Sequence, residues 1–217
     1  MSLRTIVVDL DDTLIASARA RARGRRHLLQ YGIDGRAFAA ADRRWWQLFS
    51  TGAYSIEDLR LGRLADVGVT GPDAKKIDAA YRAIGNDIRI RVGARRLLRE
   101  LKAAGFRTVI LTNGTVDPQR HKVERHRLHL MVDGVVVTEE IGHHKPDPRA
   151  FHAALNLVQG RPREAAMVGD TLDFDIAGAL ASGFQRAVWI TGRRFQHPDP
   201  RVVRVSRLDQ VMPALTA

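Results

Sequence analysis

The segment Ile6-Val7-Val8-Asp9-Leu10-Asp11-Asp12-Thr13 decides the fold, because it is a short apolar run that ends in three acidic residues. A strand of this kind brings its last residues to the carboxyl edge of a parallel sheet, where α/β proteins bind their ligands. Asp9 and Asp11 would point to opposite sides of an ideal strand, so the chain must turn after Asp9 if they act together. The polar residues that end in Thr13 suit such a turn. Carboxylates this close repel one another unless a cation lies among them, and such sites favour hard ions such as Mg²⁺. The alternative for this segment alone is an acidic loop in which Asp or Thr caps the next helix.

The composition predicts an ordinary globular protein. The chain has 217 residues, of which 45% are hydrophobic, and it contains no cysteine. This length favours one large domain, or a core domain with a smaller insertion. No apolar stretch is long enough to cross a bilayer, so no membrane partner is expected. With no disulfide or thiolate chemistry and no leader-like segment before the first strand, we expect a cytoplasmic protein.

The net charge of +11 is the unusual bulk property, and arginines in residues 19–26 contribute much of it. Such a run indicates either attraction to phosphorylated partners, nucleic acid included, or a compositional bias on a solvated helix face. The sequence has no zinc-finger spacing, RNP-like aromatic motif or basic leucine zipper. Charge alone therefore does not predict nucleic-acid binding as the main function.

Apolar, β-branched segments alternate with helical patterns along most of the chain. We expect strands at residues 5–9, 107–112, 134–138, 165–169 and 187–190, with a weaker one near 201–205. Asp147-Pro148 is typical of a helix start, and Gly105 and Gly183 of helix ends. Strands that alternate with helices predict the α/β class, here a Rossmann-like parallel sheet with helices on both faces.

One connection is much longer than a single crossover requires, namely that between Thr13 and the strand that begins at Arg107. Most of it has helical patterns, and we expect helices at residues 37–49, 55–65 and 72–85. The simplest interpretation is a small helical domain, residues 17–88, inserted over the edge of the sheet. Residues 1–16 and 89–217 would then form the core domain.

Polar residues also follow the later core strands. They are Thr112-Asn113-Gly114, His143-His144-Lys145-Pro146 and Gly169-Asp170, with Asp173 and Asp175 beyond the last. Each has a common structural explanation by itself: a turn, a solvated lysine or a helix cap. The carboxyl ends of neighbouring parallel strands converge in space, however, so these side chains should meet.

The converging side chains supply the parts that phosphoryl transfer needs. A carboxylate can attack phosphorus and form an acyl phosphate. A second carboxyl group can protonate the leaving oxygen and then activate the water that resolves the intermediate. Mg²⁺ and a lysine can neutralise the charge of a phosphate ester.

The motifs Asp9-x-Asp11-x-Thr13, Thr112-Asn113-Gly114, Lys145-Pro146 and Gly169-Asp170-x-x-x-x-Asp175 have the order and spacing of the haloacid dehalogenase-like (HAD) superfamily. The chain resembles this family over its whole core. The insertion looks like the helical cap of the family's C1 subgroup. Within it, residues 52–63 are similar to the cap segment of nucleotidase-like and sialic-acid-phosphate phosphatase-like members.

The resemblance implies roles for particular residues. Asp9 would be the nucleophile and Asp11 the general acid/base, with Lys145 as the third catalytic residue. Thr112 and Lys145 would bind phosphate, and Asn113 and Gly114 would complete the phosphate cradle.

The resemblance also implies a Mg²⁺ site made of carboxylate and carbonyl oxygens. Its ligands would be Asp9, the Asp11 carbonyl and Asp170, with Asp175 in a supporting or water-mediated position. Asp173 is not expected to be a ligand. In the helical insertion, Arg63, and less so Arg60, could reach a polar or anionic substrate group, although a surface arginine on an amphipathic helix is the alternative.

The acidic residue at position 11 narrows the expected activity, because dehalogenase members lack a carboxylate there and phosphonatase members use a cap lysine instead. The resemblance therefore implies a Mg²⁺-dependent phosphatase, a monomer or homodimer, that acts on a small phosphorylated metabolite such as a nucleoside monophosphate or a sugar phosphate. A phosphomutase and a basic nucleic-acid-binding protein with a vestigial phosphatase core are the alternatives. Response-regulator receivers combine similar residues, but they are shorter and have no helical insertion.

Overall fold

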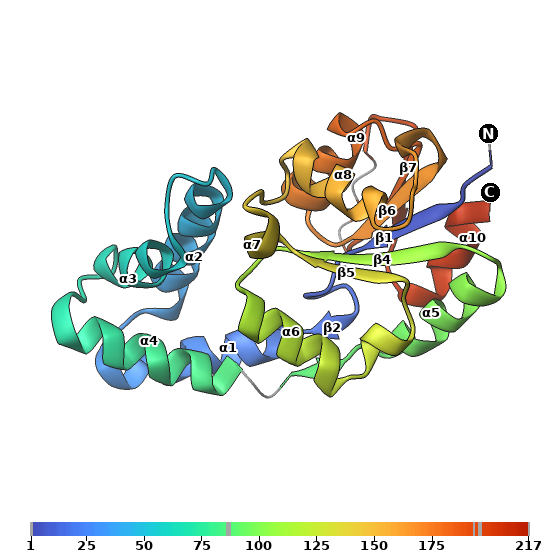
Figure 1. Cartoon of the computed structure of the whole chain (residues 1–217). Coiled ribbons are helices and arrows are strands. Elements are labelled where there is room, and N and C mark those ends of the chain that lie inside the picture. The colour runs from blue at the N-terminus through green and yellow to red at the C-terminus, as the bar shows by residue number, and fades with distance from the viewer. Residues whose placement is uncertain (1, 86–87, 193, 195–196, 217) are drawn as a thin grey trace. The chain divides into compact units, whose positions relative to one another are not determined.

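The computed structural model describes residues 2–85, 88–192, 194 and 197–216. The chain forms two compact units, which Figure 1 shows with their helices and strands labelled. The first, here called the sheet unit, comprises Met1–Ile15 and Ile90–Ala217, and the second, the helical unit, comprises Ala16–Arg89. The chain passes between them through two short strands that pair with each other, β2 (Ile15–Ala16) and β3 (Arg89–Ile90).

The sheet unit is built on a parallel sheet of six strands in the order β5-β4-β1-β6-β7-β8. The strands are β1 (Thr5–Val8), β4 (Arg107–Thr112), β5 (Gly134–Val137), β6 (Ala165–Gly169), β7 (Arg186–Ile190) and β8 (Val202–Val205). Each agrees with its predicted strand to within one residue at either end. The predicted α/β class is therefore confirmed, and the order places β1 at the centre of the sheet.

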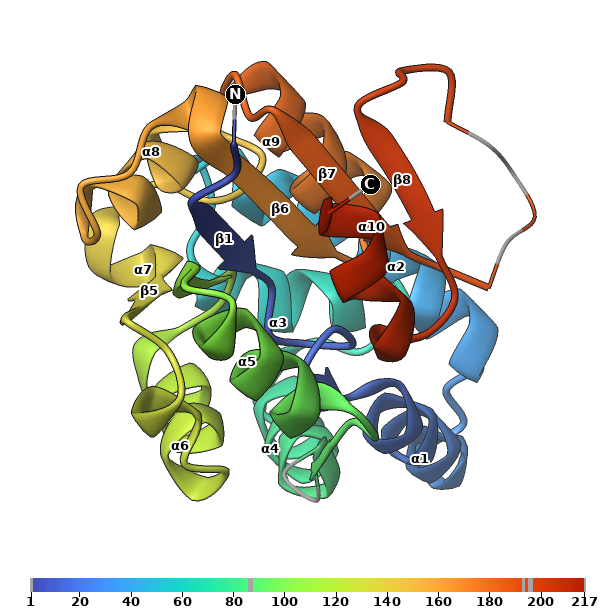
Figure 2. The same ribbon diagram turned by 90° about the vertical axis from the view of Figure 1, so that its right-hand side faces the viewer.

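Helices cover both faces of this sheet (Figures 1 and 2). On one face lie α8 (Pro148–Asn156) and α9 (Ala177–Ala181), and on the other lie α5 (Ala94–Ala103), α6 (Val116–Arg125) and α10 (Val211–Thr216). Val7 and Met167, which are paired in register, join Phe151 of α8 in one buried cluster. Burial on both faces explains why the central strands are almost wholly apolar.

Short elements complete the sheet unit. They are α7 (Thr138–Ile141), the 3₁₀ turns Leu128–Leu130, Pro162–Glu164 and Leu208–Gln210, and a π-helical turn at Leu172–Ile176. The helix that was expected to end at Gly183 begins with that wider turn, in which the backbone N–H groups of Asp175 and Ile176 both donate to the Thr171 carbonyl. The wider turn lets the Asp175 carboxylate accept hydrogen bonds from the Thr171 N–H and hydroxyl. The first turn of the helix is thus adapted to hold Asp175.

The helical unit contains α1 (Ala18–Leu28), a 3₁₀ turn at Leu29–Tyr31, α2 (Gly35–Ser50), α3 (Ile56–Ala65) and α4 (Gly71–Gly85). Side chains cap two of these helices, as Asp34 accepts from the first turn of α2, and Ser55 forms a capping box with Asp58 in α3. The helical unit has a hydrophobic core of its own, which includes Leu28, Phe38 and Tyr81. In the described part of the chain, no helix combines the length and the apolar character that a membrane span requires.

Candidate active site

Asp9 lies directly after the central strand β1, where the chain makes the expected turn. Its backbone N–H donates to the Val168 carbonyl at 2.9 Å and so extends the pairing of β1 with β6 by one residue. The backbone N–H groups of Leu14 and Ile15 then both donate to the Leu10 carbonyl at 2.9 Å. Asp12 has a φ of 61° in this turn, a left-handed conformation that aspartate tolerates better than most residues with a side chain.

Lys145 is buried and connects two acidic residues. Its Nζ donates to Asp9 Oδ1 at 2.8 Å and to Asp175 Oδ1 at 2.6 Å. Burial disfavours the ammonium ion, but Asp175 and Asp9 outweigh it and raise the pKa of Lys145 above its ordinary value. Asn113 fixes the backbone of this lysine, because its Oδ1 accepts from the Lys145 N–H at 2.8 Å and its Nδ2 donates to the Lys145 carbonyl at 2.9 Å.

The two carboxylate oxygens of Asp9 differ in their hydrogen bonding. The side chain is 7% exposed, and its Oδ2 is buried with no hydrogen-bond partner among the residues that the structure describes. Burial raises the pKa of Asp9 well above its usual value, Lys145 lowers it, and Asp175 and Asp170 raise it further. An unpaired buried polar atom is costly, so Oδ2 marks a place where the fold leaves an electron-rich atom available to a ligand.

Asp9, Asp170 and Asp175 could together hold a metal ion. Each offers one carboxylate oxygen, and the three atoms lie within 4.8 Å of one another. Asp175 is fully buried, and Thr171 donates to its Oδ2 from the backbone N–H at 3.0 Å and from the hydroxyl at 2.7 Å. A set of hard oxygen donors with an unpartnered atom fits Mg²⁺.

Asp11 belongs to a second hydrogen-bonded group in the sheet unit. Lys122 Nζ donates to its two carboxylate oxygens at 2.9 and 2.7 Å, and Gln119 Nε2 donates to Oδ2 at 3.0 Å. Gln119 Nε2 also donates to Thr112 Oγ1, and Gln119 Oε1 accepts from Lys122 at 2.6 Å. The structure therefore links Asp11 with Thr112 through two residues of α6 that the sequence interpretation did not include.

A signal for these two residues was present in the sequence. Gln119 and Lys122 are three residues apart on a helix, so they share a face, and this helix begins at Val116, two residues after Gly114. Gly114 has a φ of 140°, and a Cβ atom there would lie 3.1 Å from Gln119 Cγ. The glycine thus allows Gln119 to pack closely against the end of β4.

Arg63 lies in the interior of the helical unit. Its side chain is 7% exposed, and it donates to Asp42 Oδ1 at 2.6 Å and to Asp78 Oδ1 at 2.7 Å. Its guanidinium group also lies over the rings of Phe38 and Tyr81. The substrate-binding role expected for Arg63 stays a prediction, and these contacts favour a role in holding the helical unit together.

The sequence is similar to those of known proteins. A model of the haloacid dehalogenase-like hydrolases matches residues 3–183. Human N-acylneuraminate-9-phosphatase is 30% identical over 209 residues, which cover 87% of this chain and 82% of that protein. Ribulose-1,5-bisphosphate 5-phosphatase of Halopiger xanaduensis is 32% identical over 199 residues, with coverage of 85% and 83%.

The fold also matches solved structures. The magnesium-bound HAD-hydrolase YfnB of Bacillus subtilis has a TM-score of 0.82 at 21% identity, and the alignment covers the whole of both chains. This likeness shows the fold. The match of the family model over most of the sequence shows that the chain belongs to the haloacid dehalogenase-like hydrolases, as its motifs predicted.

Proposed function

We propose that this enzyme, a phosphatase of the HAD family, hydrolyses a small phosphorylated metabolite through a phosphoryl intermediate on Asp9. The observation that carries the proposal is the asymmetry of the Asp9 carboxylate. Oδ1 is held by Lys145 at 2.8 Å, whereas Oδ2 is buried and has no partner in the described part of the chain. A nucleophilic carboxylate needs both a fixed orientation and an oxygen that no protein group occupies.

The proposed reaction has two steps. Asp11 begins the cycle as the neutral acid. The Asp9 carboxylate attacks phosphorus, the bond from phosphorus to the ester oxygen breaks, and Asp11 gives its proton to the departing alcohol. Asp11 then takes a proton from a water molecule that attacks the phosphorus of the aspartyl phosphate. Inorganic phosphate leaves, and both carboxyl groups return to their starting states. Lys145, whose pKa is raised, stays an ammonium ion and compensates the charge that builds up at phosphorus.

Mg²⁺ is the cofactor that the donor set fits. Asp9 and Asp170 would hold it, together with the Asp11 backbone carbonyl, and a bound Mg²⁺ would reduce the repulsion between the phosphate dianion and the attacking carboxylate. Both carboxylate oxygens of Asp175 already accept hydrogen bonds, from Lys145 and Thr171. Those bonds favour a supporting position for Asp175, in which it orients Lys145. Thr112, Asn113 and Gly114 would form the phosphate cradle at the end of β4.

The substrate proposal rests on the relatives. Two of them are named for phosphate esters of a sugar acid and of a sugar, which favours a phosphorylated sugar or sugar acid over a nucleoside monophosphate. We propose that residues 17–88, which lie within the helical unit, are the cap that selects this substrate, and that residues 1–16 and 89–217 are the catalytic core. The monomeric or homodimeric state and the cytoplasmic location stay predictions.

Phosphate release from a defined panel tests the proposal. The panel contains N-acetylneuraminate 9-phosphate, ribulose 1,5-bisphosphate, glucose 6-phosphate and a nucleoside 5′-monophosphate, each assayed with Mg²⁺ and with EDTA. We expect Mg²⁺-dependent release that disappears in Asp9→Asn, with Asp173→Asn as the matched control because Asp173 is exposed. Release that is equal in wild type and Asp9→Asn, with both chains folded, would contradict the proposal.

A further inference from the structure

Gln119 and Lys122 form a small hydrogen-bonded group with Asp11, the proposed acid/base residue. Gln119 is 3% exposed, and its amide is fully used, since Nε2 donates to Asp11 Oδ2 and Thr112 Oγ1 while Oε1 accepts from Lys122 Nζ. A primary amide has two N–H donors and one carbonyl, so each of its groups has a partner. Lys122 Nζ reaches both Asp11 and Gln119 and closes the group.

The ammonium group of Lys122 fixes the orientation of the Gln119 amide. If that amide turned over, Nε2 would face the ammonium group, and Oε1 would face the Asp11 carboxylate. Two donors would then face each other at one contact, and two acceptors at the other. Lys122 therefore determines that the donor end of Gln119 faces Asp11 and Thr112.

This orientation has a consequence at each of the two contacted residues. Thr112 Oγ1 accepts a hydrogen bond from Gln119, and its own proton is donated in a long hydrogen bond, at 3.5 Å, to the Asn113 carbonyl, from which it can turn to an anion. The Asp11 carboxylate receives hydrogen bonds on both oxygens, which restricts the rotation of its side chain. Restricting a proton-transfer group before the substrate arrives reduces the entropy lost on reaching the transition state.

We infer that Gln119 and Lys122 are positioning residues, which together orient the Asp11 carboxylate for proton transfer and the Thr112 hydroxyl for phosphate binding. The inference rests on the proposed function, in which Asp11 protonates the leaving group. It differs from a purely structural role, in which the same contacts would only attach α6 to the turn after β1.

Dependence on the leaving group separates these two roles. An alkyl phosphomonoester needs a proton on its leaving oxygen, whereas p-nitrophenyl phosphate releases a stabilised phenolate without one. In Lys122→Met we expect kcat for the best alkyl substrate of the panel to fall by about 10-fold to 100-fold, a part of what general acid catalysis contributes. The kcat for p-nitrophenyl phosphate should fall much less, and KM should change by less than about 3-fold for both. Lys122→Arg should restore most of the lost rate.

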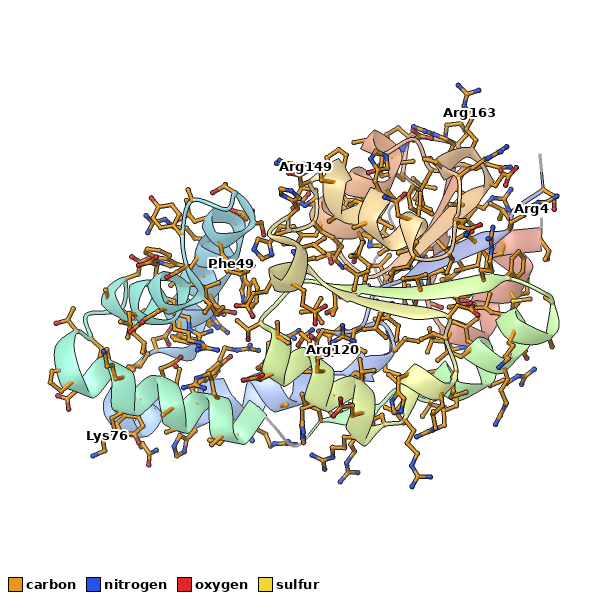
Figure 3. The ribbon with its side chains drawn as sticks, in the orientation of Figure 1. Arg4, Phe49, Lys76, Arg120, Arg149 and Arg163 are labelled. Carbon is orange, nitrogen blue, oxygen red and sulfur yellow. The ribbon has the colours of Figure 1, made fainter. Side chains whose placement is uncertain are left out.

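The control variant is Arg120→Met. Arg120, labelled in Figure 3, lies on the same helix and pairs with Glu140 at 2.8 Å, so its loss also removes an ion pair from α6. We expect it to leave the ratio of the two rates unchanged. If Lys122→Met does not fold, Lys122→Gln, which keeps an N–H donor without the charge, gives the same comparison. Gln119→Met should in addition weaken inhibition by inorganic phosphate, because Gln119 contacts Thr112 directly.

Three results would overturn the inference. Equal losses on both substrates in Lys122→Met, with no rescue by arginine, would indicate a structural role only. A leaving-group effect in Asp11→Asn but not in Lys122→Met would leave the proposed function intact and remove the inference. Wild-type protein that releases phosphate from no ester would overturn the proposed function, and the inference with it.

Discussion

Replacing Arg63 by methionine tests whether this arginine stabilises the helical unit or binds the substrate. The guanidinium group donates to Asp42 at 2.6 Å and to Asp78 at 2.7 Å, and its central carbon lies 5.2 Å and 4.9 Å from the ring centroids of Phe38 and Tyr81. Burial opposes its charge, but the two aspartates outweigh it and raise the pKa of Arg63. Methionine fills a similar volume without the charge, so the variant isolates the ionic contacts.

The expected loss of stability follows from what each aspartate retains. Removing one partner of a buried ion pair costs about 3–5 kcal/mol, because the remaining charge stays buried without compensation. Asp78 keeps its second partner, Arg82, at 2.7 Å, whereas the Asp42 side chain is only 15% exposed and loses the arginine. We therefore expect the lower end of that range, about 3 kcal/mol. For a chain of 217 residues this corresponds to a fall in Tm of roughly 6–12 °C.

Thermal unfolding of the full chain, followed by circular dichroism, measures this loss. Arg44→Met is the control, because Arg44 pairs with Asp66 at 2.6 Å but its side chain is 62% exposed, and such pairs contribute about 1 kcal/mol or less. Adding Asp42→Asn to Arg63→Met should recover part of the loss, since it removes the uncompensated charge. A loss below about 1 kcal/mol together with a KM raised more than about 10-fold would refute the structural reasoning and support substrate binding by Arg63.

Three further predictions concern the sheet unit. Mg²⁺ at 100 times its Kd should add about 2.7 kcal/mol to the free energy of unfolding of the wild type, and so raise its Tm above the value in EDTA. It should not raise the Tm of Asp170→Asn. Gly169→Ala should lower the free energy of unfolding in urea by about 1–3 kcal/mol and abolish phosphate release. The added Cβ atom would lie 2.5 Å from the Asp175 side chain and so overpack the site. Hydrogen bonds from Arg149 lower the pKa of Asp147 to about 2. Ionised Asp147 therefore stabilises the folded chain above its unfolded pKa of about 3.9, and this stabilisation is lost as the pH falls through about 2. The difference in urea midpoint between wild type and Asp147→Asn should accordingly become smaller as the pH falls from the unfolded pKa of Asp147 to its folded pKa.

Matched variants control these experiments. Gly192→Ala should be tolerated, because a Cβ there meets no atom of the described residues within 4 Å, its chain neighbours aside. Asp173→Asn removes an exposed carboxylate two residues from Asp175 and should keep the Mg²⁺-dependent rise in Tm. An equal rise in Asp170→Asn, an unchanged stability of Gly169→Ala, or a pH-independent difference for Asp147→Asn would each contradict its prediction.

The fold was predictable because its strands carry a local signal that tertiary contacts reinforce. The strands at Arg107–Thr112 and Ala165–Gly169 begin and end where expected, since β-branched apolar residues buried on both faces are bounded by polar turns. The start of the helix after Asp170 was not predictable in the same way. It depends on Thr171 and Asp175, whose side-chain contact widens the first turn, and the helical pattern alone does not report such a contact.

The candidate site was predictable where its residues end strands. Asp9, Thr112 and Asp170 follow neighbouring strands of one sheet, and topology alone brings such positions together. Gln119 and Lys122 lie on a helix face, where polar residues usually meet solvent. Their residue types alone therefore did not select them, and only their spacing and their place after Gly114 pointed to them. The burial of Arg63 was equally hidden, because Asp42 and Asp78 reach it from two other helices.

The charge balance of the site explains why Asp9, the proposed nucleophile, lies in an unfavourable environment. Lys145 gives one hydrogen bond to Asp9 and one to Asp175, so one ammonium ion is shared between two buried carboxylates, with Asp170 close by. Thr171 donates a hydrogen bond to the second oxygen of Asp175, whereas none of the described residues donates one to the second oxygen of Asp9. The raised pKa of Asp9 expresses this imbalance, since burial disfavours its charge more than Lys145 favours it. A cation or a phosphoryl group at Oδ2 would relieve the same imbalance, so the free energy that the fold loses at Asp9 becomes available for binding and for reaction.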